Sequence, residues 1–252
     1  MRRIQRSRPI WSAGGVAVIF ANSPTMARAA KAATAIVPIV FTMGEDPVEE
    51  GIVEILNRPG GNVTGFSDFN NLLASKQVGL LHEIVPKAAV FAVLVNPANP
   101  NAEVNSKQAQ AAADALGVEL QVLRASTERD IESAFAAMVH FRVGALLNPP
   151  DPFLGGQREQ IVTLAARHAI PAISDQRLWP AAGLLMSYGT DRLETHRQAG
   201  IYVGRILKGE KAGDLPVQQS TKFQFVINLK AARALNLEIP PGILAVADEV
   251  IE

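Results

Sequence analysis

The sequence predicts an α/β fold made of two lobes, each built on a doubly wound parallel β-sheet. The chain has 252 residues, of which 48% are apolar and 19% charged, so it can bury a large core in one or two domains. Apolar runs typical of buried strands alternate with amphipathic segments typical of helices. This alternation predicts parallel sheets covered on both faces, because a right-handed crossover places a helix over each pair of parallel strands.

The alternation is clearest between residues 89 and 190, which we expect to form one complete lobe. The run 90–95 is apolar and contains several β-branched residues. Thr127 and Asp130 form a capping-box-like pair in front of a helix. The expected strands are 90–95, 118–123, 143–147, 170–174 and 184–187. The expected segments between them are helices at 100–116, after Thr127 and at 157–168, and a short segment at 176–182.

The residues before this lobe follow the same pattern with fewer strands. Asp46, with Glu49 three residues later, predicts the start of a helix. We expect strands at 16–20, 36–41 and 63–66, and helices at 23–34, 47–56 and 72–85. A free-standing parallel sheet usually has more strands than this.

The residues after 190 are expected to complete the first lobe. Asp191 and Glu194 form another capping-box pair, which predicts a long helix that ends near Gly209. The strand expected at 223–228 precedes a final helix, and we expect it to return to the first lobe. The predicted domains are therefore a discontinuous N-terminal lobe, residues 1–88 plus 191–252, and a second lobe, residues 89–190.

Charge and cysteine content exclude several classes of partner and site. Lys plus Arg and Asp plus Glu each number 24, so the net charge is zero and no overall positive field attracts nucleic acid. The chain has no cysteine, which excludes disulfides, thiolate metal sites and cysteine nucleophiles. No uncharged apolar run reaches the roughly 20 residues that a membrane-spanning helix needs. The expected partner is a small molecule or a protein, and no nucleic acid.

The first thirty residues fit two descriptions. Four arginines among the first eight residues, an uncharged stretch at 9–21 and a small-residue site at 27–29 are typical of a cleaved secretory signal. Two glycines interrupt the uncharged stretch, and 16–20 is equally typical of a buried strand. Residues 1–29 are therefore either a cleaved signal or part of the first lobe.

Motifs of several enzyme classes are absent from the sequence. There is no G-x-S-x-G nucleophile elbow, no G-x-x-x-x-G-K-[ST] phosphate loop, no H-E-x-x-H zinc helix and no G-x-G-x-x-G after the first strand. Four histidines lie far apart on predicted helices or at their ends, as solvated or helix-terminal imidazoles: His82, His140, His168 and His196. We therefore expect no enzyme activity, no cofactor and no metal site.

Polar residues follow most of the predicted strands directly. The carboxyl ends of parallel strands form the edge at which open α/β sheets bind ligands, because loops converge there and helix N-termini point outward. The candidate ligand-binding residues at these positions are Ser23, Thr25, Asp46, Asn96, Asp151, Asp175 and Tyr188. The carboxylates suit a ligand ammonium, the hydroxyls of Ser23 and Thr25 suit a ligand carboxylate, and Tyr188 suits an apolar or aromatic side chain. Helix capping is the alternative role for the polar residues, and a capped helix end can still face a ligand.

Six short segments together resemble one known family. The most specific of them is 57–65, with the sequence Asn-Arg-Pro-Gly-Gly-Asn-Val-Thr-Gly. The others are 36–41, 44–48, 93–97, 187–189 and 226–230. They are similar to the ABC transporter substrate-binding proteins of the tryptophan/tyrosine-binding type, and the similarity extends over nearly the whole chain from about Gly14.

The resemblance implies a type I periplasmic binding-protein fold, in which two α/β lobes close on a small ligand and deliver it to an ABC permease in the membrane. It also implies a periplasmic location and an amino acid or related compound as the ligand, bound by the loops around the seven candidate residues. Family members carry a signal peptide and about two further strand–helix units before the point where this chain begins. The resemblance therefore implies that the first lobe is incomplete and truncated at its start.

Three other functions are open for such a chain. The first is an enzyme of doubly wound fold that acts on a small polar substrate, since a fold does not by itself assign a function. The second is an intracellular ligand sensor, for which the 14 residues before Gly15 are too few to hold a DNA-binding module. The third is a truncated remnant that binds no ligand.

Overall fold

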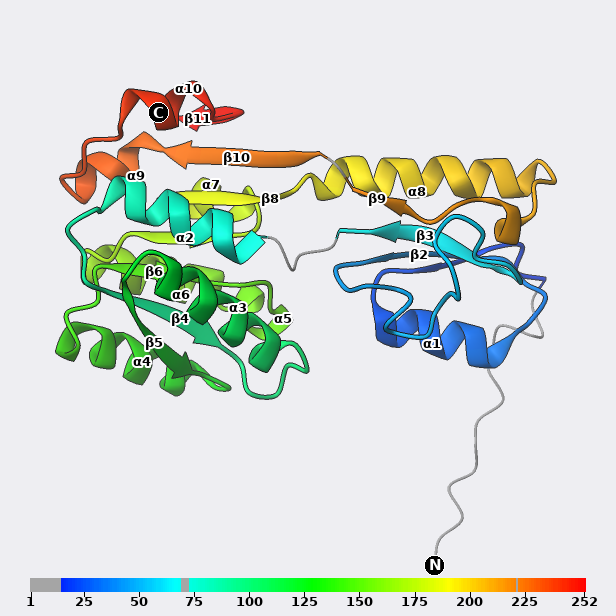
Figure 1. The fold of residues 1–252 in the computed structure, drawn as a ribbon, viewed down its shortest axis with the longest axis horizontal. Coiled ribbons are helices and arrows are strands. Elements are labelled where there is room, and N and C mark those ends of the chain that lie inside the picture. Colours follow the sequence, from blue (N-terminus) through cyan, green and yellow to red (C-terminus); the bar gives the residue numbers. More distant parts are fainter. Residues whose placement is uncertain (1–14, 69–72, 221) are drawn as a thin grey trace, which may run out of the picture. The chain divides into compact units, whose positions relative to one another are not determined.

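The computed structural model describes residues 15–68, 73–220 and 222–252, which fold as two units (Figure 1). Unit 1 contains the described residues of Met1–Phe69 and Asp191–Lys222, and unit 2 contains those of Asn70–Thr190 and Phe223–Glu252. Each unit has its own sheet covered by helices on both faces, which is the predicted α/β class. The arginines on which the signal interpretation depends lie outside the described residues.

Unit 1 is built on a four-stranded parallel sheet with the strand order β1-β2-β3-β9. Its elements are β1 (Ile19–Ala21), α1 (Pro24–Ala33), β2 (Ile39–Met43), β3 (Val63–Ser67), α8 (Arg192–Leu207), the 3-10 helix η3 (Ala212–Asp214) and β9 (Gln218–Gln219). The three strands and the first helix expected here all form, with their bounds shifted by up to three residues. The short strand β9 has no counterpart in the prediction.

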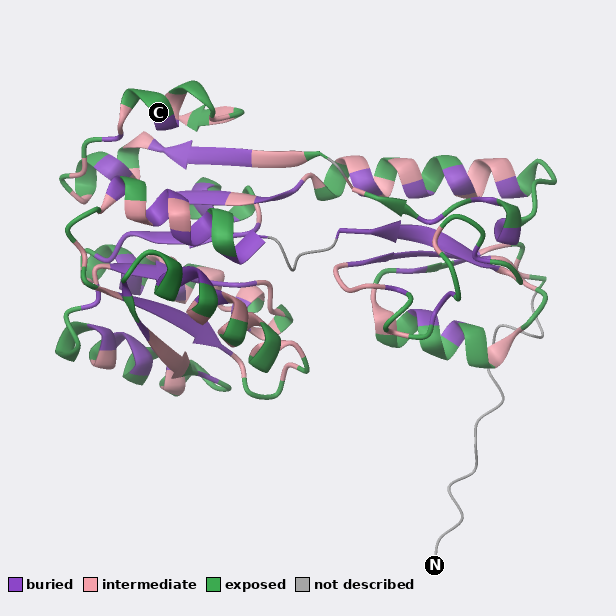
Figure 2. Ribbon diagram, in the orientation of Figure 1, coloured by how far each residue is buried: buried purple, intermediate pink, exposed green. Residues whose placement is uncertain are grey.

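Side chains of β2 alternate between the two cores of unit 1. Ile39 and Phe41 join a core with residues of α1, whereas Val40 joins a second core with residues of α8. Figure 1 shows α1 and α8 on opposite faces of this sheet. In the second core the rings of Phe66 and Tyr202 lie 4.8 Å apart between their centroids. The buried residues follow this arrangement, with continuous burial along β2 and β3 and partial burial along the helices (Figure 2).

The helix expected at 47–56 does not form, so that prediction is wrong. The segment is a series of turns in which Asp46 Oδ1 accepts a backbone hydrogen bond at 2.8 Å. Gly51 has a φ of 65°, and Ile52 and Val53 after it enter the core that contains α1. A residue in the left-handed region ends helical geometry, and glycine adopts that region without strain. The capping residue Asp46 therefore stabilises a turn and not a helix.

Unit 2 is built on a seven-stranded sheet with the strand order β11-β10-β8-β7-β6-β4-β5. Its strands are β4 (Val90–Val95), β5 (Glu119–Arg124), β6 (Ala145–Leu147), β7 (Ala172–Ser174), β8 (Met186–Thr190), β10 (Phe223–Asn228) and β11 (Glu249–Ile251). Its helices are α2 (Leu73–Ile84), α3 (Ala102–Ala115), α4 (Glu128–His140), α5 (Pro152–Gly156), α6 (Arg158–Arg167), α7 (Leu178–Ala182), α9 (Leu229–Ala234) and α10 (Pro241–Ala245). The five strands expected between residues 89 and 190 are confirmed, and the capping box of Thr127 and Asp130 at the start of α4 has both of its hydrogen bonds.

The strand β4, which lies between β6 and β5, is buried on both of its faces. Phe91, Val93 and Val95 join a core with residues of α2, α3, α9 and α10. Ala92 and Leu94 join a second core with residues of α4, α5, α6 and α7. A strand that contributes to two cores has no polar face, which is why 90–95 is an unbroken apolar run.

The division of the chain differs from the predicted one in two places. The strand at 223–228, expected in the first lobe, is β10, and it pairs with β8 of unit 2 in the antiparallel direction. The helix α2, also expected in the first lobe, buries Val78 and Leu81 in a core of unit 2. The physical reason is that β8 would otherwise expose an unpaired edge, which β10 covers. Residues 73–88 and 223–252 therefore belong with unit 2.

Among the described residues, no helix combines the length and the apolar character that crossing a membrane requires.

Gly189 in β8 lies where no side chain fits, and this gives a test of the packing in unit 2. A Cβ atom there would lie 2.0 Å from Asp175 O, just past the carboxyl end of β7. We expect Gly189→Ala to lower the free energy of unfolding by about 1–3 kcal/mol, because the backbone must move. The matched control is Gly79→Ala in α2, where a Cβ meets nothing within 4 Å and alanine favours the helix. Urea denaturation measures the free energy of unfolding of both variants. If Gly189→Ala were as stable as Gly79→Ala, the close approach of β8 to Asp175 would be contradicted.

Glu194 in the first turn of α8 gives a second test, by titration. Arg197 donates to its carboxylate from Nε at 2.8 Å and from Nη2 at 2.6 Å, and this interaction lowers the pKa of Glu194 from 4.5 to about 2. Because the pKa falls on folding, the stabilisation is present above the ordinary pKa and is lost as the pH falls toward 2. We expect a carboxyl NMR titration midpoint of about 2 for Glu194 and a higher midpoint in Arg197→Met. An unchanged midpoint in the variant would show that Arg197 is not the cause.

Candidate functional site

The carboxyl edge of the sheet in unit 2 collects four of the seven candidate residues. β4, β6, β7 and β8 run parallel, so their carboxyl ends lie at the same edge. Asn96 follows β4 directly, Asp151 follows β6 after three residues, Asp175 follows β7 directly and Tyr188 lies within β8. The predicted position after the strands is thus confirmed for the first three, whereas Tyr188 is part of its strand.

Asp175 is the most buried of the candidate carboxylates, with 8% of its surface exposed. Gln176 Nε2 donates to its Oδ2 at 3.0 Å, and its Oδ1 lies 3.2 Å from Ser174 Oγ. The N-cap of the adjacent helix α7 is Arg177 and not Asp175.

Asp151 caps a helix and also joins two loops. Its Oδ1 accepts a hydrogen bond from Leu154 N at 2.8 Å at the start of α5. Its Oδ2 accepts one from Asn99 Nδ2 at 2.7 Å, which connects the loop after β6 to the loop after β4. Both carboxylate oxygens of Asp151 therefore accept hydrogen bonds from the protein itself, and the bond from Leu154 N is the helix-capping role.

Asn96 stabilises the turn that follows β4. Its Oδ1 accepts a hydrogen bond from Ala98 N at 3.0 Å, which is the geometry of an Asx turn. The side chain is half-buried. The helix α3 begins at Ala102, later than the start expected at residue 100, because Asn99 also caps a turn, through Asn101 N at 2.9 Å.

Tyr188 has its ring held by two aromatic neighbours. The ring stacks on Phe223 with 5.7 Å between centroids and meets Phe225 edge-on at 6.2 Å. Burial raises the pKa of Tyr188, and the charge of Asp248 raises it further, so the hydroxyl stays neutral at physiological pH. A half-buried, neutral aromatic ring at this edge can pack against an apolar or aromatic ligand group.

A buried row of polar side chains crosses the same edge and was not among the candidates. Asn148 directly follows β6, Ser174 ends β7 and Ser187 lies beside it in β8, and each is at most 1% exposed. Asn148 Nδ2 donates to Ser174 Oγ at 3.3 Å, and Ser174 Oγ donates to Asn148 O at 2.8 Å. Asn148 Oδ1 and Ser187 Oγ have no hydrogen-bond partner among the described residues. The position of Asn148 directly after an expected strand is the signal that could have found this row.

Unit 1 places its three candidate residues at the carboxyl ends of β1 and β2. Ser23 caps α1, where its Oγ accepts a hydrogen bond from Met26 N at 3.2 Å. Thr25 is exposed in the first turn of this helix. Asp46 is half-buried and holds the turn described above. Asp68 lies near them, directly after β3, and is 9% exposed. It accepts a hydrogen bond from Thr195 Oγ1 at 3.2 Å. This polar residue was not among the candidates expected from the sequence.

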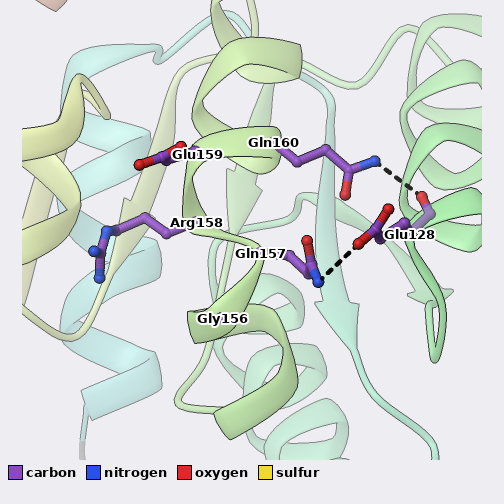
Figure 3. A pocket seen from close by; sticks show the side chains of 6 residues that line it. All are labelled: Glu128, Gly156, Gln157, Arg158, Glu159 and Gln160. Carbon is purple, nitrogen blue, oxygen red and sulfur yellow. Dashed lines mark hydrogen bonds between the residues drawn. The ribbon is translucent and has the colours of Figure 1, made fainter.

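A hollow of about 420 Å³ in unit 2 contains none of the candidate residues (Figure 3). It lies where α4 and α6 begin. Gln157 Nε2 donates to Glu128 Oε1 at 3.3 Å and Gln160 Nε2 donates to Glu128 O at 3.0 Å, whereas Figure 3 shows Arg158 and Glu159 pointing away from Glu128. The two glutamine side chains thus connect the start of α6 to the start of α4, and the hollow lies between these two helices. In the part of the chain that the structure describes, no three His, Cys, Asp or Glu side chains gather as a metal site would need.

Comparison with known sequences identifies relatives along almost the whole chain. The family model for the ABC transporter substrate binding protein matches residues 8–251. A tyrosine-binding protein from Clostridioides difficile (strain R20291) is 29% identical over 221 residues, which make up 88% of this chain and 63% of that protein. The chain therefore spans less than two thirds of the length of this relative.

Solved structures share the fold. A conserved domain protein from Vibrio cholerae O1 biovar El Tor str. N16961 has a TM-score of 0.83 and 29% identity, covering 96% of this chain and 81% of that one. An ABC domain in complex with L-Trp from Streptococcus pneumonia has a TM-score of 0.82 and 26% identity, covering 95% of this chain and 82% of that one. The α/β fold is that of the type I periplasmic binding proteins, and the chain belongs to the ABC transporter substrate-binding protein family.

Proposed function

We propose that this chain is the solute-binding component of an ABC import system, which captures an amino acid or a related small molecule and passes it to a membrane permease. The observation that carries the proposal is that Asp175, directly after β7, and Tyr188, in the neighbouring strand β8, both lie at the carboxyl edge of the sheet in unit 2. A buried carboxylate favours a cationic partner, and a half-buried ring favours an apolar one. A free amino acid with an apolar side chain supplies both an ammonium group for the carboxylate and an apolar group for the ring.

The other candidate residues have supporting parts in this proposal. Asp151 and Asn96 shape the loops after β6 and β4 through the hydrogen bonds described above. In unit 1 we propose Ser23 and Thr25 as further ligand contacts, because the start of α1 offers hydroxyls and backbone N–H groups to an anion. We also propose Asp46, whose carboxylate suits a ligand ammonium.

The relatives narrow the class of ligand. One is named a tyrosine-binding protein, and another was solved with L-Trp bound. We therefore propose an aromatic amino acid as the ligand, held without any chemical step. A periplasmic location and a permease partner belong to the same proposal, and membership of the family supports both.

Ligand-dependent stability tests the proposed function. We expect L-tyrosine or L-tryptophan to raise the thermal unfolding midpoint of the purified chain by several degrees, since a ligand at 100 times its Kd adds about 2.7 kcal/mol. Leucine, phenylalanine, glucose and ribose complete the panel, and differential scanning fluorimetry measures each. A cooperative transition that no amino acid shifts would contradict the proposal and support a remnant that binds no ligand. Conversion of any of these compounds, followed by mass spectrometry, would support an enzyme instead.

A single substitution tests the part proposed for Asp175. Asp175→Asn removes the charge and keeps the shape, so we expect the Kd for the amino acid to rise by about tenfold or more, because the ligand ammonium loses its counter-charge. The matched control is Asp114→Asn, an exposed carboxylate of α3 that likewise accepts a hydrogen bond from a glutamine side chain, Gln110 Nε2, at 2.8 Å. Isothermal titration calorimetry measures both. Equal affinities for the two variants would remove Asp175 from the site.

A further inference from the structure

Gln77 is a buried polar residue on an otherwise apolar helix face. It is 2% exposed and lies on the side of α2 that packs against the sheet of unit 2. The other buried residues of α2 are Leu73, Ala74, Val78, Leu80, Leu81 and Ile84. A buried amide costs free energy unless it is hydrogen-bonded, so the partners of Gln77 show what the side chain does.

The amide of Gln77 joins two neighbouring strands. Its Nε2 donates to Tyr188 O at 2.7 Å and to Ser174 O at 3.2 Å. The pairing of β7 with β8 ends at the pair of Ser174 and Ser187. Gln77 therefore links the two strands at the point where their own pairing stops, and both carbonyl oxygens are satisfied by one donor group.

Both of these carbonyl groups lie next to proposed ligand contacts. Ser174 directly precedes Asp175, and Tyr188 is itself a proposed contact. The backbone of Gly189 touches Asp175 so closely that no side chain fits between them. Two contacts thus hold β7 and β8 together at this end. One is the hydrogen-bonded amide of Gln77 on α2, and the other is the close backbone approach of Gly189 to Asp175.

We infer that Gln77 is a positioning residue for the ligand site: its side-chain amide holds the backbone at Ser174 and Tyr188, and so sets the separation between the Asp175 carboxylate and the Tyr188 ring. This inference rests on the proposed function. Gln77 acts from α2, and its side-chain N–H groups are directed to the two backbone carbonyls, so we assign it a positioning role and not a ligand contact. Affinity depends on such preorganisation, because a ligand that must order its own site loses part of its binding free energy.

The substitution Gln77→Met tests this role, because methionine has nearly the same length and shape but no donor. We expect the Kd for L-tyrosine or L-tryptophan, measured by isothermal titration calorimetry, to rise by about tenfold. The matched control is Ile84→Val at the other end of α2. It removes one methyl group from the core that α2 forms with the sheet of unit 2. We expect both variants to unfold at a lower temperature, and only Gln77→Met to lose affinity.

A spectroscopic measurement separates positioning from general destabilisation. The ¹³C chemical shifts of the Ser174 and Tyr188 carbonyl groups report their hydrogen bonds directly. We expect them to change in Gln77→Met and to stay at the wild-type values in Ile84→Val. Should Gln77→Met fail to fold, Gln77→Asn retains the amide on a shorter side chain that cannot reach both carbonyls, and the same losses are expected.

The outcomes distinguish this inference from the proposed function. If the wild-type chain binds neither amino acid, the proposed function fails and the positioning role falls with it. If the wild-type chain binds and the Gln77 variant binds as tightly as Ile84→Val, the positioning role alone is overturned. Unchanged carbonyl shifts in the Gln77 variant would also overturn it.

Discussion

Burial of parallel strands on both faces is the constraint on which the rest of this structure depends. A parallel strand needs a crossover to reach its neighbour, and the crossover helix covers the sheet. β4 shows the consequence, since Phe91 and Val93 face one helical layer while Ala92 and Leu94 face the other. β2 does the same in unit 1 with Ile39 and Val40. With both faces closed, the carboxyl edge is where polar side chains can gather and meet a ligand.

At that edge, helix capping and ligand binding draw on the same residue types, and the structure separates them in part. Ser23 and Asp151 both accept a backbone hydrogen bond at the start of a helix, which accounts for them without a ligand. Asp175 is different, because its carboxylate is more buried and the N-cap of the adjacent helix is Arg177. Tyr188 is likewise held by aromatic packing and not by a capping bond. Asp175 and Tyr188 are therefore the main support for a binding site at this edge.

β8 is the element on which the contacts of unit 2 converge. β10 pairs with it on one side and β7 on the other, Gly189 lies against Asp175, and the amide of Gln77 reaches its backbone from α2. Gln77 and β10 come from distant parts of the chain. A change in any of them would move the Tyr188 backbone, so the geometry of the candidate site is a property of the whole unit.

The sequence by itself determined the fold class, most of the strands and the best helix starts, because periodicity and capping are local: the run 90–95 and the pair of Thr127 and Asp130 need no distant partner to be recognised. It also placed Asp175 at the carboxyl end of its strand. A local rule failed at 47–56, where Gly51 turns the chain after a good cap. Only the tertiary structure decided that 223–228 pairs with β8, that α2 belongs to unit 2, and that Gln77 holds the ends of β7 and β8. The physical reason is that strand pairing and buried hydrogen bonds depend on which edges and carbonyl groups are left without partners once the chain has folded, and no run of neighbouring residues records that.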